Sequence, residues 1–446
     1  GVDVSTAPSL ETCDNSGPMV YESISSKQEV TPGPVVFTYD VLWRASHVKW
    51  ASRWDIYLSM DNAIPDKVHW FSIVNSMLIV LFLSVMVAMI MIRNLHRDIV
   101  RYNRVLSDEE KAEEREESGW KLVHADVFRP PASLPMLFCV AVGTGVQVLF
   151  CSAICIVFAG LGFLSPANRG SLATAVLVLF VTMGSFGGYT SARLYKTFRG
   201  RLWQKCTLCT ALLYPGVCFC TFLVFDTMLF LYGSTGAVPL QSMLCLLALW
   251  FGVSVPLVFV GALLGFKQEP MGFPVITSNI PREIPSQQPW YLAPAFTTVV
   301  GGILPFGACF VELFFILSSM WMDQYYYVFG FTGLVFIILL VTCCEITIVL
   351  CYFQLCSENY HWWWRSFLTS GSTALYVFVY SCLYFSRLEA DKSFTYVLYF
   401  GYMVLITLGL LLLTGSCGFF ACLWFTTQIY VRPTPSTHKF SRSKSP

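Results

Sequence analysis

The sequence has 446 residues, of which 55% are hydrophobic and only 12% are charged. A soluble domain usually has about a quarter of its residues charged, so this composition excludes an ordinary soluble globular protein. The net charge of +1 does not indicate a nucleic-acid or acidic partner.

The N-terminal segment, residues 1–70, is predicted to be the C-terminal part of a lumenal domain. Residues 1–34 are polar and rich in Ser, Pro and Glu, without the apolar core of a signal peptide. Because the first residue is Gly1, we expect a processed chain or a fragment. Residues 35–57 are rich in β-branched and aromatic side chains, which favours a strand followed by an approach to the membrane surface.

Nine apolar stretches follow, each long enough to cross a bilayer core of about 30 Å at about 1.5 Å rise per residue. The predicted fold class is therefore an all-α polytopic membrane protein with nine transmembrane helices after a partly β-leaning lumenal segment. The helical domain covers residues 71–428, and residues 429–446 form a tail. The predicted spans are 71–92, 135–164, 171–192, 206–231, 239–266, 292–319, 328–354, 366–386 and 395–428.

Lysine and arginine are distributed unequally between the two sides of the predicted bundle. One side, which includes the 93–134 loop and the C-terminal tail, carries 20 of the 28 Lys and Arg residues. Positive charge marks the cytosolic side. The N-terminal segment is then predicted to be lumenal and the tail cytosolic.

Three acids lie inside predicted spans: Asp226, Glu312 and Glu345. An ionisable side chain in hydrocarbon is costly and is a functional candidate by default. Asp226 and Glu312 could lie at a similar depth near the lumenal side, with Glu345 closer to the cytosol. One interpretation is acids that hydrogen-bond to neighbouring polar groups; the other is a stepped path for protons or cations.

Glycine and proline recur within the spans, where glycines allow close helix approach and prolines kink helices. Most are predicted to serve packing, and some could shape a groove for another protein's helix. The sequence contains none of the GxGxxG, GxxxxGK[ST], HExxH or GxSxG motifs. The CxxC of Cys206 and Cys209 has no second pair. We therefore predict no enzymatic activity, no cofactor and no metal site.

The cytosolic edge of the bundle carries two candidate interface segments. Trp362, Trp363 and Trp364 precede Arg365, and indole rings favour headgroup depth, where the arginine could hold a lipid phosphate. Arg282 and Glu283 lie in a proline-restricted loop between the fifth and sixth spans. Either of them could pair with another loop.

Several ordered motifs resemble the nonaspanin family, also called the transmembrane 9 superfamily, and its larger members in particular. They occur at 119–124 (GWKLVH), 126–131 (DVFRPP), 164–170 (LSPANRG), 214–216 (YPG), 279–285 (NIPREIP), 302–307 (GILPFG), 352–356 (YFQLC) and 360–366 (YHWWWRS).

The resemblance implies a multi-pass protein of Golgi and endosomal membranes that binds and sorts other membrane proteins. It implies clients with glycine-rich transmembrane helices, besides the lipid bilayer itself and cytosolic coat or adaptor proteins. Most of the family's lumenal domain is absent from this sequence, and residues 432–446 are basic and Ser/Pro-rich instead of ending in the family's Lys-x-Asp-type signal. The alternative function, which rests on the three membrane acids, is a transporter or channel for protons, cations or small solutes.

Overall fold

The computed structural model describes Ala45, most residues between 70 and 96, and residues 119–161, 163–164, 170–233, 237–321, 329–388 and 393–431. The chain divides into two compact units, residues 1–61 and 62–446, and all the helices considered below belong to the second. Apart from Ala45, the predicted β-leaning segment lies outside the described residues, as does the tail beyond residue 431.

Every regular element in the described part of the chain is a helix, as the hydropathy pattern predicts. The elements are α4 (Gly119–Leu122), α5 (Pro135–Gly160), α6 (Ser171–Thr197), α7 (Trp203–Leu231), α8 (Leu240–Leu249), η3 (Trp250–Ser254), α9 (Val255–Lys267), η4 (Trp290–Leu292), α10 (Pro294–Gly301), α11 (Ile303–Trp321), α12 (Phe329–Cys356), α13 (Trp363–Gly371), α14 (Thr373–Phe385) and α15 (Ser393–Val431).

Eight helical stretches among the described residues are long and apolar enough to cross a membrane, and they coincide with the second to ninth predicted spans. Only some residues of the first predicted span are among the described residues. Helical residues occur there between 70 and 96 and include the shorter apolar stretch Ser76–Met89. The multi-pass helical architecture is thus confirmed, while the count of nine stays a prediction.

Three of the spans are not single regular helices. The stretch Leu240–Lys267 passes through the π-helical turn η3 just before Pro256. A proline offers no backbone N–H to the preceding turn, and a widened turn accommodates that loss. The sixth span breaks between α10 and α11 beside Pro305, and the eighth breaks between α13 and α14 at Ser372.

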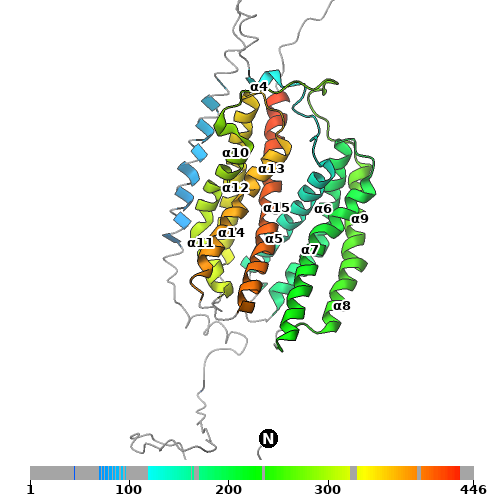
Figure 1. Cartoon of the computed structure of the whole chain (residues 1–446), viewed down its shortest axis with the longest axis vertical. Helices are drawn as coiled ribbons and strands as arrows, with labels where there is room; N and C mark the ends of the chain where they lie inside the picture. The colour runs from blue at the N-terminus through cyan, green and yellow to red at the C-terminus, as the bar shows by residue number, and fades with distance from the viewer. Residues whose placement is uncertain are drawn as a thin grey trace, which may run out of the picture. The chain divides into compact units, whose positions relative to one another are not determined.

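The helices form two groups that share α5 and α15 as their common seam (Figure 1). On one side α6 packs against α9 and α5, and α7 packs against α6, α5 and α9. On the other side α12, α13 and α14 pack around α15. The seam is tight, because a Cβ on Gly145 of α5 would overlap the Leu412 carbonyl of α15.

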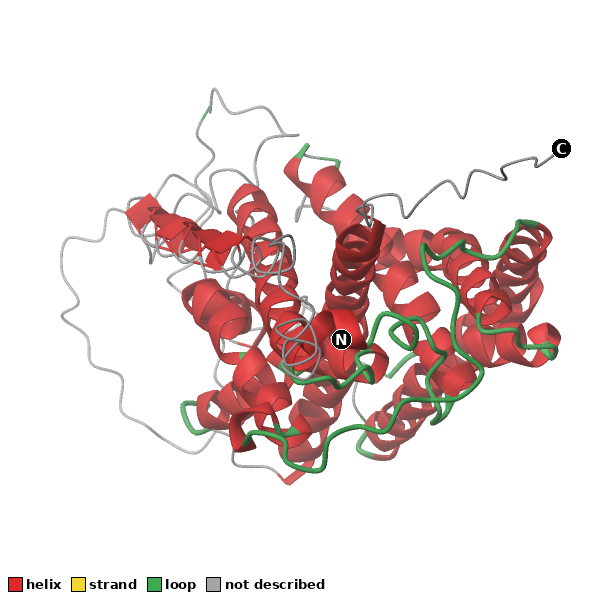
Figure 2. Cartoon of the chain, turned by 90° about the horizontal axis from the view of Figure 1, so that it is seen from above, coloured by secondary structure: helices red, strands yellow, loops and turns green. Residues whose placement is uncertain are grey.

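The largest buried cluster lies where the ends of these helices meet three loops. We call these loops the cap and define it as residues 119–134, 268–292 and 357–362. From above, loop segments run across the helix ends (Figure 2). The third of these loops leads directly into the tryptophans of α13, so the cap positions most of the predicted interface residues.

Candidate functional site

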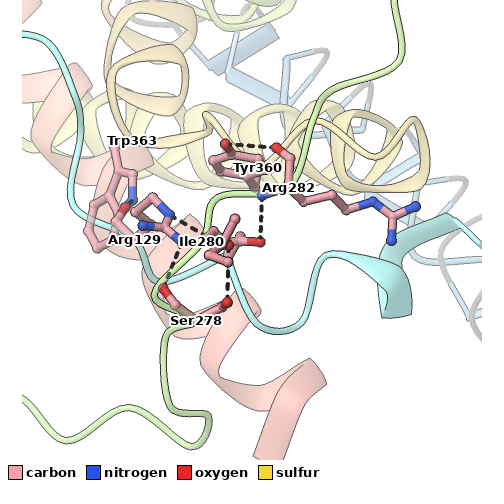
Figure 3. Close-up of polar contacts among 7 residues, drawn as sticks. Arg129, Ser278, Ile280, Arg282, Tyr360 and Trp363 are labelled. Carbon is pink, nitrogen blue, oxygen red and sulfur yellow. Dashed lines mark hydrogen bonds and ion pairs between the residues drawn. The ribbon is translucent and has the colours of Figure 1, made fainter.

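The cap joins loop segments that are far apart in the sequence. The Ser278 N–H donates to the Ala125 carbonyl at 2.9 Å, and the Arg129 guanidinium donates to the Ser278 carbonyl at 2.8 Å. Figure 3 shows the Arg129 side chain of the first loop beside Ser278 of the second. Loop backbone has no helical ladder, so its polar groups need partners of this kind.

Asp126 is the acid at the centre of the cap, and it is almost fully buried. Its carboxylate accepts from Arg129 Nε at 3.0 Å and forms an ion pair with the same guanidinium. The other carboxylate oxygen accepts from the Arg282 backbone N–H at 3.2 Å. Charge-assisted hydrogen bonds of this type are the strong ones, so one side chain fastens the first cap loop to the second.

Arg282 does pair with another loop, and the structure identifies the partner as Glu358. The distance from the Arg282 guanidinium to Glu358 Oε2 is 2.7 Å. The Arg282 carbonyl also accepts from the Tyr360 hydroxyl at 3.2 Å (Figure 3). The second cap loop is thereby fastened to the third.

The tryptophan run has a different environment from the one predicted. Each indole N–H donates to a carbonyl of the first cap loop: Trp362 to Val127 at 2.8 Å, Trp363 to Arg129 at 2.8 Å and Trp364 to Ser133 at 2.9 Å. The exposed fractions of Trp362 and Trp363 are 0% and 2%.

Trp362 and Trp363 lie at the end of a span, as predicted, but their rings are buried within the protein instead of being exposed to lipid headgroups. Their rings stack on each other, with centroids 4.3 Å apart, and pack against Phe419 of α15. Because a buried indole N–H needs an acceptor, the first cap loop supplies its carbonyls.

Arg365 makes its contacts within the protein. Its guanidinium donates to Thr297 Oγ1 at 3.0 and 2.9 Å and to the Leu292 carbonyl. It therefore ties the start of α13 to the start of α10.

The three membrane acids lie on three different helices. Asp226 on α7 accepts from the Val238 N–H at 2.6 Å and so fixes the turn into α8. Glu345 on α12 accepts from Ser84 at 2.9 Å. Glu312 on α11 is buried, with an exposed fraction of 2%. Among the described residues, no group of three or more His, Cys, Asp or Glu side chains could hold a metal ion.

The predicted packing role of the glycines is clearest between α6 and α9. A Cβ on Gly261 or Gly265 would overlap the backbone carbonyls of Ser185 and Tyr189. Such close approach strengthens dispersion contacts where lipid supplies no hydrophobic driving force. By contrast, a Cβ on Gly252 or Gly307 would meet open space.

The chain matches the protein family described as Endomembrane protein 70 over residues 1–394. It is 56% identical over 423 residues to Transmembrane 9 superfamily member 9 of Arabidopsis thaliana, covering 94% of this chain and 64% of that protein. It is 49% identical over 411 residues to Transmembrane 9 superfamily member 4 of Homo sapiens, covering 91% and 63%.

It is also 50% identical over 423 residues to Transmembrane 9 superfamily member 2 of Rattus norvegicus, covering 94% and 62%. The chain thus spans less than two thirds of the length of these relatives. No solved structure matches it.

Proposed function

The chain belongs to the transmembrane 9 superfamily of multi-pass endomembrane proteins, and on that premise we propose that it binds other membrane proteins and directs their sorting. Its clients are membrane proteins with glycine-rich transmembrane helices, and its compartments are the Golgi apparatus and endosomes. The proposal assigns it no enzymatic activity, and it places coat or adaptor proteins on the cytosolic side.

The observation that carries the proposal is the uncovered apolar surface of α7 and of the α8–α9 span. Only 17% of the most apolar stretch of each is buried within the protein, compared with 56% for the span formed by α13 and α14. These two spans pack on the rest of the bundle mainly through α5 and α6. Their outward surface is thus available for a helix of another membrane protein, and small residues on that helix would allow close approach.

Site-specific photo-crosslinking in cells tests this proposal. A photoreactive amino acid is placed at Val224 of α7 or Leu244 of α8, whose exposed fractions are 55% and 57%. The matched control position is Leu383 of α14, which is 66% exposed on the other group of helices. We expect adducts with polytopic proteins at the first two positions and few at the third. Equal adduct patterns at all three positions would remove the support for client binding.

The alternative function is transport of protons, cations or small solutes through the membrane acids. The buried carboxyl group of Glu312 is the observation that favours it, because such a group has to be neutral, paired or hydrated. The test is proton or cation flux in liposomes with the parent chain, Glu312→Gln and Glu345→Gln. Flux that is absent from the parent, or unchanged in both variants, would exclude this function.

A further inference from the structure

A cluster of exposed positive charge lies where α6 ends, α7 begins and α9 ends. We call it the basic corner and define it as Arg199, Arg201, Lys205 and Lys267. All four side chains are exposed. The ends of α6 and α9 lie next to each other in Figure 1, in agreement with their extensive packing.

Two contacts hold the parts of the corner together. Lys196 Nζ donates to the Phe266 and Gln268 carbonyls at 2.7 and 2.8 Å, which places the end of α6 against the residues on both sides of Lys267. The Trp203 ring at the start of α7 stacks on Phe266, with centroids 5.5 Å apart and an interplanar angle of 24°. These contacts bring the end of α6, the start of α7 and the end of α9 together.

The charge of the corner is not neutralised within the described part of the chain. The ion pairs formed there join Asp126 to Arg129 and Arg282 to Glu358, both in the cap. None of the four corner cations forms an ion pair with another described residue. The nearest acid along the chain is Glu269, which is exposed. Like charges gathered on a surface repel one another, so the corner favours a bound polyanion.

The surface beneath these cations is apolar. Leu208 on the first turns of α7 and Leu263 and Leu264 near the end of α9 are exposed, as is Leu202 just before α7. A soluble polyanion would gain nothing from this surface, whereas an amphiphile would use both parts.

We propose that the basic corner binds a polyanionic phospholipid, with its phosphorylated headgroup on the four cations and its acyl chains along the exposed leucines. Basic residues at the ends of transmembrane helices attract anionic headgroups in this way. The site lies outside the cap and does not depend on client binding.

The experiment measures binding of short-chain lipids to the purified 446-residue chain in neutral detergent by native mass spectrometry. The ligands are dioctanoyl phosphatidylinositol bisphosphate, dioctanoyl phosphatidylcholine and the free inositol trisphosphate headgroup. The test variant is R199Q/R201Q/K205Q. The control variant K439Q/R442Q/K444Q removes the same charge from the C-terminal tail. A further variant, Lys267→Gln, alters the corner from a different helix.

We expect the bisphosphate lipid to bind the parent at least tenfold more tightly than phosphatidylcholine or the free headgroup. The corner triple variant should lose at least tenfold in affinity, and Lys267→Gln should lose part of it. The tail variant should stay within twofold of the parent.

Unchanged binding by the corner variant would overturn the proposal, provided that its thermal unfolding matches the parent. Equal binding of the free headgroup would also overturn it, because the acyl chains would then contribute nothing.

Discussion

Asp126 accepts hydrogen bonds from two cap segments at once, from the Arg129 side chain and from the Arg282 backbone. Replacing Asp126 with Asn removes the negative charge that pairs with Arg129 in a buried setting. We expect the variant to lose roughly 2–3 kcal/mol of stability, the usual cost of breaking a charged hydrogen bond. Thermal unfolding in detergent measures the loss. Glu283→Gln, at an exposed position in the same cap, should change the unfolding midpoint little.

The pKa of His361 predicts how the stability of the cap depends on pH. Partial burial lowers the pKa of His361 below its ordinary value of 6.5, and the nearby charge of Arg129 lowers it further. The unfolded chain therefore binds a proton at a higher pH than the folded chain does. The contribution of the neutral imidazole is present in full above pH 6.5 and is lost as the pH falls through the lowered pKa.

We therefore compare the parent with His361→Gln over the range in which histidine titrates, from about pH 7 to about pH 5. The unfolding midpoint of the parent should fall more steeply over this range than that of the variant. A pH series of thermal melts in detergent compares the two. Parallel curves would show that the imidazole does not contribute.

The tryptophan run shows how far single residues could be predicted from the sequence. Hydropathy places Trp362 at the edge of a span, and that position is correct. The acceptor of its indole N–H is Val127, 235 residues away along the chain, and no local pattern specifies such a contact. A tryptophan beside an arginine is equally typical of a headgroup anchor and of a buried cap, so only the tertiary packing decides between them.

Pro215 and Trp250 form a compensating pair between helices. Pro215 lies inside α7 and offers no N–H to the carbonyl of Ala211, four residues earlier. The indole N–H of Trp250, in the π-helical turn η3, donates to that same carbonyl at 3.1 Å. A side chain from the neighbouring span thus satisfies the acceptor that the proline leaves open, as hydrocarbon surroundings require.

A double-mutant cycle tests this compensation. Trp250→Phe alone should cost about 1 kcal/mol of stability, because the Ala211 carbonyl loses its donor. In a Pro215→Ala background, the restored backbone N–H can bond to that carbonyl, so the same change should cost less. Unfolding in detergent provides the four values. An equal cost in both backgrounds would show that Trp250 acts only through packing.

The close packing of α6 against α9 gives a second prediction about pairs of helices. Gly261→Ala places a methyl group on the Ser185 carbonyl, so the helices must separate. We expect a loss of about 1–3 kcal/mol, as for overpacking in a core. Gly307→Ala is the matched control, because its methyl group would meet open space and alanine favours a helix. It should leave the thermal unfolding midpoint unchanged or higher.

At the scale of elements, the apolar stretches predicted positions and lengths better than internal breaks. The prolines within spans predicted kinks, and the sixth span breaks at Gly302, just before Pro305. The break at Ser372 has no proline. It lies against Gly302 of the other broken span, whose Cβ would come within 2.5 Å of Ser372 Oγ. The hydropathy pattern identifies neither that break nor the neighbour beside it.

The last helix, α15, links the membrane bundle to the cap. It has 39 residues, or about 58 Å at 1.5 Å rise per residue, far more than a bilayer core of about 30 Å. Its extra length brings the Tyr430 hydroxyl to the Trp120 carbonyl at 2.7 Å. The sequence predicted an overlong ninth span. The contact made by its C-terminal end could not be predicted, because the partner lies in a loop 310 residues earlier in the chain.

The orientation of the whole bundle is the prediction that follows from charge alone. The cap and the basic corner lie at the same ends of the helices, and the turn between α7 and α8 lies at the opposite end (Figure 1). The excess of Lys and Arg on the cap side predicts that the cap faces the cytosol and that this turn faces the lumen. Glycan acceptors can test this assignment, because the sequence contains no N-x-[ST] motif of its own.

An acceptor carried in a long Gly/Ser spacer is inserted after Gly233 in one variant and after Glu269 in the other. The spacer holds the acceptor clear of the membrane, and both insertion sites are exposed. Expressed in cells, the first variant should gain a glycan that glycosidase removes, and the second should gain none, because only the lumenal side holds the transferase. If only the variant with the insertion after Glu269 is glycosylated, the bundle has the opposite orientation. The basic corner would then bind its lipid in the lumenal leaflet.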